Sequence, residues 1–163
     1  VLEARDVLYV LRNHECAPSD LKKKSVELAG LMLEMGKKAK KGKGNAMALK
    51  IIESGKAYKK FMEIVKAQKG KEIDPSKIKL ARFKYVVRST KSGKIKHIDN
   101  KLISRIARGA GAPHDKEAGV YLRVKKNSKV KKGLPLFTIY ANNKDKLKFS
   151  VNTYKDIGAV YFY

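Results

Sequence analysis

The spacing of apolar residues changes near residue 72, and this change constrains the fold more than any other feature of the sequence. Before it, apolar side chains recur every three or four residues, as on one face of an amphipathic helix. After it, short runs rich in β-branched and aromatic residues alternate with turn residues, as in strands. The sequence therefore predicts an α+β protein, with a helical part, residues 1–72, followed by a mixed β-sheet part, residues 73–163.

Four helices are expected in the first part, beginning with one over residues 2–12. Ser19 or Asp20 is expected to cap the second helix and Asn45 the third, because their side-chain oxygens can accept a bond from a free backbone N–H. Gly36 is expected to end the second helix in the left-handed conformation, which costs glycine little. Gly55 and Gly70 are expected to end the third and fourth helices.

Strands and short helices alternate in the second part. Asp99 is expected to cap one helix, and Asn142 or Asn143 another. A glycine-bearing loop, residues 109–119, lies between the first of these helices and the next strand. The expected strands are residues 79–88, 94–98, 120–124, 136–141 and 157–163.

The chain carries 39 basic and 15 acidic residues, for a net charge of +24. The excess is larger after residue 70, with 23 basic and seven acidic residues against 16 and eight before it. Such a charge suggests nucleic-acid binding. Only seven of the basic residues are arginine, however, and the lysines are spread along the chain. A nucleic-acid partner is therefore not favoured, and a basic RNA- or ribosome-associated module stays open as the alternative function.

Four segments, residues 2–8, 20–33, 54–70 and 109–141, carry a family resemblance in this order. They include Leu2-Glu3-Ala4-Arg5-Asp6, Ser54-Gly55-Lys56-Ala57 and Gly109-Ala110-Gly111-Ala112-Pro113. These stretches resemble the pyrimidine-nucleoside phosphorylase family, and most of all its archaeal AMP phosphorylase branch. The resemblance covers nearly the whole chain and corresponds to the C-terminal portion of the family.

The resemblance implies a C-terminal domain of α/β-hammerhead and barrel-sandwich type. It also implies that the parent protein is a pentosyltransferase, and a homo-oligomer is expected. Such an enzyme cleaves thymidine, AMP or another nucleoside 5′-monophosphate, with inorganic phosphate as co-substrate and no other cofactor. The single cysteine fits a reduced, cytoplasmic setting, and no apolar run approaches the length needed to span a bilayer. The family's catalytic residues lie upstream of the matching segments. We therefore expect no catalytic residue in this chain and a structural role for it.

The loop after the helix capped by Asp99 is the candidate substrate-proximal site. Gly109 and Gly111 permit a close approach of the backbone, and His114 and Lys116 could meet an anion. The resemblance permits this loop to lie over the substrate cleft. The alternative is a connecting loop whose glycines only satisfy positive φ angles.

Asp6 and residues 120–141 are two further candidate sites. Some bacterial members of the family bind a metal ion through a Glu at the position that matches Asp6, which makes Asp6 a candidate metal ligand; the alternative is a helix carboxylate beside an Arg or Lys. The three histidines and Cys16 show no metal-binding spacing. Residues 120–141 resemble half of a biotinyl or lipoyl carrier domain but lack the motif around its modified lysine, so a carrier domain is a third interpretation.

Overall fold

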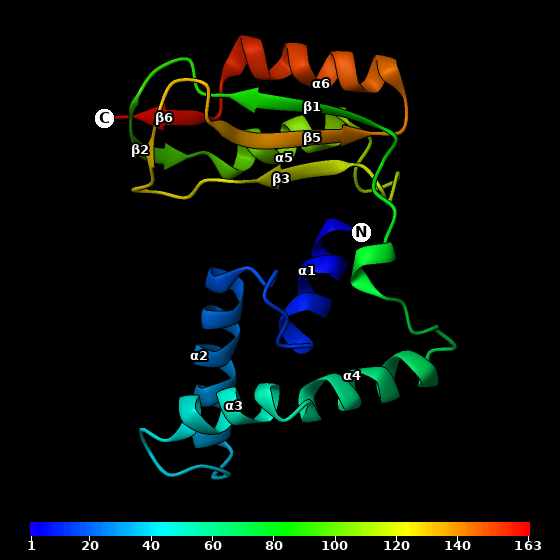
Figure 1. Cartoon of the computed structure of the whole chain (residues 1–163), viewed down its shortest axis with the longest axis vertical. Helices are drawn as coiled ribbons and strands as arrows, with labels where there is room; N and C mark the ends of the chain where they lie inside the picture. Colours follow the sequence, from blue (N-terminus) through cyan, green and yellow to red (C-terminus); the bar gives the residue numbers. More distant parts are fainter. The chain divides into compact units, whose positions relative to one another are not determined.

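A computed structural model describes all of residues 1–163 and divides the chain into two compact units (Figure 1). The helical unit is Glu3–Ile78, and the sheet unit contains Val1–Leu2 and Lys79–Tyr163. All six strands belong to the sheet unit. The predicted α+β class, with helices preceding the strands, is confirmed.

Four α-helices and a short 3-10 helix make up the helical unit. Its longest helix, α2, runs against α3, and α4 follows α3 after a two-residue connection. The α-helices are α1 (Leu2–Leu11), α2 (Ser19–Met35), α3 (Gly44–Glu53) and α4 (Lys56–Ala67), and the 3-10 helix is Pro75–Lys77.

The predicted N-caps of α2 and α3 are wrong. Pro18 occupies the N-cap of α2, and no side chain caps that end. Helix α3 starts at Gly44, one residue before Asn45, and Lys43 is its N-cap. The backbone N–H of Gly44 instead donates to a carboxylate oxygen of Glu34 at 2.8 Å. Asn45 therefore lies inside the first turn of α3, one residue too late to act as its N-cap.

The left-handed residue after α2 is also shifted from its predicted position. Gly36 has a φ of −78°, and Lys37 adopts the positive φ of 55°. Gly55 does adopt the left-handed conformation, with a φ of 72°, at the junction of α3 and α4. Local sequence thus located these turns to within one residue but did not always select the residue that takes the strained angle.

Helices α2 and α3 cross at two glycines. A Cβ atom on Gly44 would lie 2.1 Å from the carbonyl oxygen of Gly30, and one on Gly30 would lie 2.6 Å from the backbone nitrogen of Asn45. Neither separation is compatible with a real side chain. The two backbones therefore approach this closely only because both positions are glycine.

Glu34 makes the stability of this helix crossing depend on pH. Backbone N–H groups of Gly42 and Gly44 hold the pKa of the Glu34 carboxyl below its usual value. A carboxyl whose pKa is lower in the folded than in the unfolded state stabilises the fold at pH values above its unfolded-state pKa. This stabilisation is lost as the pH falls through the folded-state pKa. We expect the urea midpoint of the helical unit to fall below about pH 4.5 and Glu34→Gln to flatten that acid limb. An unchanged acid limb in Glu34→Gln would show that other carboxylates cause it.

Two three-stranded sheets form the sheet unit. Their strand orders are β1-β5-β3 and β4-β2-β6, and every pairing is antiparallel. The strands are β1 (Phe83–Arg88), β2 (Gly93–Ile98), β3 (Gly119–Leu122), β4 (Lys129–Val130), β5 (Pro135–Ala141) and β6 (Val160–Phe162). The sheets are thus antiparallel rather than mixed, and each pairing joins strands that are distant in the chain.

Two helices cover the larger sheet. Helix α6 (Lys144–Ile157) lies along β1 and β5, and helix α5 (Asn100–Gly109) packs against α6 and β3 (Figure 1). Phe137 of β5 is fully buried and meets the Tyr154 ring of α6 edge-on, with ring centres 5.1 Å apart. The core of the unit is therefore centred on β5 and the inner faces of α5 and α6.

The predicted caps of these two helices are confirmed. An Asp99 carboxylate oxygen accepts bonds from the backbone N–H groups of Lys101 and Leu102, at 2.8 and 3.1 Å. Asn143, rather than Asn142, caps α6 and accepts from the N–H of Asp145 at 2.6 Å. Each cap satisfies N–H groups that have no partner inside the helix.

Candidate functional site

The loop between α5 and β3 folds back on itself through its own backbone. The N–H of Asp115 donates to the carbonyl of Gly111 at 2.9 Å, and the N–H of Ala118 donates to the carbonyl of Asp115 at 3.0 Å. The peptide bond between Ala112 and Pro113 is cis. The two backbone hydrogen bonds give the loop a defined conformation.

A carboxylate anchors this loop to the helix that covers the sheet. Asp115 Oδ2 lies 2.8 Å from Nζ of Lys146 on α6. Gly111 has a φ of 119°, and a Cβ atom there would lie 2.3 Å from Asp115 Oδ2. The absence of a side chain at Gly111 therefore leaves the space that the Asp115 carboxylate occupies.

The structure brings the four predicted loop residues together on one short segment. Gly109 ends α5 against Phe149, where an added Cβ would lie 3.1 Å from the ring. His114 and Lys116 are exposed on either side of the anchored Asp115. Two cationic or hydrogen-bonding side chains thus flank a carboxylate that Lys146 already neutralises, which leaves them available to an anion.

Replacing Gly111 tests the anchoring geometry. We expect Gly111→Ala to destabilise the sheet unit by about 2 kcal/mol, because it adds strain at positive φ and displaces the Asp115 carboxylate. Urea unfolding followed by far-UV circular dichroism measures the change. Gly133→Ala is the matched control, since Gly133 has a φ of 87° but nothing within 4 Å of an added Cβ. An equal loss in both variants would contradict the proposed contact.

A second polar cluster, in the helical unit, was not found from the sequence. Arg12 Nη2 donates to the Tyr58 hydroxyl at 2.8 Å, and that hydroxyl donates to Glu72 Oε1 at 2.5 Å. Burial and the bond to Glu72 raise the pKa of the Tyr58 phenol. Because the cluster ties the end of α1 and helix α4 to the chain near residue 72, its role is to fix the path of that segment.

Asp6 lies beside its neighbour Arg5, with Oδ1 3.6 Å from Nε. Burial raises the pKa of the Asp6 carboxyl, and the Arg5 charge opposes that shift. No group of three or more His, Cys, Asp or Glu side chains converges anywhere in the chain. The residues present therefore do not form a metal site by themselves, and the assignment of Asp6 as a ligand stays a prediction.

A large apolar groove opens on the helical unit. Its volume is about 550 Å³, and its walls come from α1, α2 and α3 with contributions from Lys38 and Ala57. Helix α2 buries only Gly30, whereas Met32 on the groove is 72% exposed. The lining residues are Val7, Val10, Leu11, Leu21, Ser25, Ala29, Met32, Leu33, Lys38, Ala48, Ile51, Ile52 and Ala57. A 17-residue helix with so little burial is incomplete as a packed element.

Residues 94–157, which include the anchored loop, match the C-terminal domain of pyrimidine nucleoside phosphorylases. The AMP phosphorylase of Methanocaldococcus jannaschii is 43% identical over 150 residues, which is 92% of this chain. The chain belongs to the pyrimidine-nucleoside phosphorylase family. The AMP phosphorylases of Hyperthermus butylicus and Pyrococcus furiosus are 42% and 46% identical, over 98% and 90% of this phosphorylase-family chain.

The matched segment is the C-terminal portion of these longer relatives. The chain spans 30% of the M. jannaschii protein, 32% of the H. butylicus protein and 29% of the P. furiosus protein. None of the helices in this phosphorylase-family chain is long and apolar enough to cross a membrane. The family resemblance predicted from the sequence is confirmed.

Proposed function

We propose that the chain forms the C-terminal part of an enzyme that cleaves a nucleoside or nucleoside 5′-monophosphate with inorganic phosphate, AMP being the first substrate to test. The observation that carries this proposal is the 43% identity to an AMP phosphorylase over 92% of the chain. In the reaction, a phosphate oxygen forms a bond to C1′ of the sugar while the bond from C1′ to the base nitrogen breaks. The base leaves with the electron pair and takes up a proton, so no redox cofactor is required.

The anchored loop is the part of this chain proposed to lie near the substrate. His114 and Lys116 would contribute positive or hydrogen-bonding groups toward the phosphate, held in place by the Asp115–Lys146 pair. Gly109 and Gly111 would allow the backbone to approach the ligand closely. None of these residues is assigned a bond-making or bond-breaking step, and the reacting contacts are placed on the remainder of the enzyme.

The apolar groove supports a role within a larger protein. Because an exposed apolar surface of this size is uncommon on a self-sufficient domain, we propose that the polypeptide preceding this segment in full-length relatives covers it. Homo-oligomer formation stays a prediction. A reducing, cytoplasmic setting is part of the proposal, because Cys16 is the only cysteine and the fold uses no disulfide.

A chimera tests the proposed function. The matching C-terminal segment of M. jannaschii AMP phosphorylase is replaced by this chain, and phosphate-dependent release of adenine from AMP is measured. We expect the chimera to release adenine and the isolated chain to release none. A chimera truncated after the residue that corresponds to Ile78 is the control, and we expect it to lose most of the activity. The proposal would be contradicted if the isolated chain released adenine as fast as the chimera, or if the chimera folded but released none.

Thiol labelling tests the covering of the groove separately from catalysis. In a Cys16→Ser background, we expect a maleimide to label Met32→Cys rapidly in the isolated chain and at least about tenfold more slowly in the chimera. Lys41→Cys, in the exposed loop after α2, is expected to react at the same rate in both. Equal labelling of Met32→Cys in the two proteins would show that the groove stays open.

A further inference from the structure

The outer face of the small sheet β4-β2-β6 gathers lysine and tyrosine side chains from three separate parts of the sheet unit. We name Lys94, Lys96, Lys129 and Tyr163 the Lys–Tyr face. Lys94 pairs directly opposite Lys129, so the two side chains leave the sheet on the same side. The Nζ atoms of Lys94 and Lys96 each lie 5.8 Å from the centre of the Tyr163 ring. The four side chains therefore form one continuous surface.

The opposite side of this sheet belongs to the core, which fixes the orientation of the Lys–Tyr face. Ile95, between the two β2 lysines, is 0% exposed, and Val130, next to Lys129, is 4% exposed. Phe162, next to Tyr163, packs against the same core. Since side chains alternate along a strand, the Lys–Tyr face must point to solvent. Tyr163 is accordingly 70% exposed.

The lysines of this face form no ion pair within the chain. None of its lysines is within 4.0 Å of a carboxylate; the ion pairs of the chain involve other residues. None of the six strands of the sheet unit contains an Asp or Glu. Like charges directly opposite each other destabilise an antiparallel pair. An anionic ligand that contacts both Lys94 and Lys129 would remove that repulsion.

The exposed tyrosine rings indicate which kind of anionic ligand fits this face. The Tyr163 ring is exposed, and the neighbouring Tyr161 is 43% exposed and stacks on the His97 ring, with centres 5.9 Å apart. Exposed aromatic rings beside lysines are the pattern that binds unpaired bases, which stack on the rings while the backbone contacts the cations. A duplex hides its base faces and offers only phosphate to such a surface.

We propose that the Lys–Tyr face binds single-stranded nucleic acid, with phosphates on Lys94, Lys96 and Lys129 and a base stacked on Tyr163. This binding is independent of the proposed phosphorolysis. One of the sequence-based arguments against nucleic acid was that the lysines are spread along the chain; the other, the small number of arginines, still holds. Strand pairing removes the first objection here, because it brings Lys129 next to Lys94 from 35 positions away in the chain.

Fluorescence anisotropy of the 163-residue chain with a labelled oligouridylate of about 12 nucleotides tests the proposal. We expect saturable binding that weakens as salt rises. Tyr163→Leu should weaken it about tenfold by removing the stacked base. Lys94→Ala with Lys129→Ala should lower the slope of log affinity against log salt by about 1.4, as expected for two phosphate contacts on a single strand.

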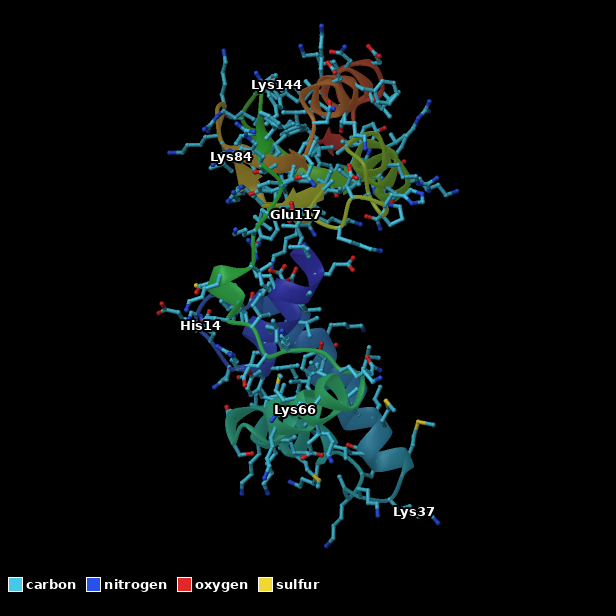
Figure 2. The ribbon with its side chains drawn as sticks, turned by 90° about the vertical axis from the view of Figure 1, so that its right-hand side faces the viewer. His14, Lys37, Lys66, Lys84, Glu117 and Lys144 are labelled. Atoms are coloured by element: carbon cyan, nitrogen blue, oxygen red, sulfur yellow. The ribbon has the colours of Figure 1, made fainter.

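A matched charge control uses two exposed lysines of the helical unit, Lys23 and Lys66, of which Figure 2 labels Lys66. Lys23→Ala with Lys66→Ala removes the same charge, and we expect less than about a threefold change in affinity. Three results would each overturn the proposal: equal losses in the two double variants, wild-type affinity in Tyr163→Leu, or binding of a duplex or anionic lipid vesicles at least as tight as that of oligouridylate. Unchanged circular dichroism and urea midpoints show that each variant is folded.

Discussion

Gly44→Ala is expected to destabilise the helical unit by about 3 kcal/mol, near the upper end of the cost of overpacking. The added methyl group would lie 2.1 Å from the carbonyl oxygen of Gly30 and 2.6 Å from its carbonyl carbon. Both neighbouring atoms are backbone, so the clash is relieved only if α2 and α3 move apart. That movement would also break the bond from the Gly44 N–H to Glu34. Urea unfolding followed at 222 nm gives the change in the free energy of unfolding.

Gly42→Ala separates this clash from ordinary glycine effects. Gly42 lies two residues away with a φ of 77°, and an added Cβ would meet nothing within 4 Å. Its replacement should cost about 1 kcal/mol, from backbone strain alone. If Gly44→Ala proves no more costly than Gly42→Ala, the close crossing of the two helices is not the constraint described above.

Phe137→Ala is expected to cost the sheet unit about 4 kcal/mol, which is a large part of the stability of a small domain. Phe137 is 0% exposed, lies opposite Val87 and Leu122 on the two neighbouring strands, and meets Tyr154 edge-on. Its loss would open a cavity bordered by two strands and a helix, where little collapse is possible. The measurement is the urea midpoint of the sheet unit, read from its tyrosine signal.

Phe149→Ala serves as the comparison, because it makes the same chemical change in the same unit. Phe149 lies on α6 but is 64% exposed. A cost of less than about 1 kcal/mol is expected there. Similar costs at the two positions would mean that Phe137 does not occupy the centre of the core.

The sequence correctly predicted the starts of those helices that are capped by a side chain at the start of the helix itself. Asp99 and Asn143 cap their helices as expected, because each side chain bonds to N–H groups two or three residues ahead. Asn45 failed for the opposite reason. Helix α3 begins at Gly44, one residue before Asn45, and the Gly44 N–H bonds to Glu34, ten positions upstream.

The sequence could not predict which strands pair or which side chains meet in the candidate site, because these contacts join residues that are far apart in the chain. Phe83 pairs with Ala141, and no local pattern specifies that register. The candidate loop was recognised from its glycines and its family resemblance, but the Asp115–Lys146 pair spans 31 residues. The apolar groove had a signal in the sequence, namely the many apolar positions of α2, which predict a helix with one apolar face but not what covers that face. Their exposure became visible only when the helices were placed.

The central strand of the larger sheet, β5, is also among the last to be made. During synthesis on a ribosome, β1 and β3 would leave the exit tunnel before the strand that joins them exists. Until residue 141 has emerged, their edges would lack partners and would be open to pairing with other nascent chains. A shortened polypeptide that keeps β1 and β3 but stops before β5 should therefore yield insoluble material rather than a smaller folded protein.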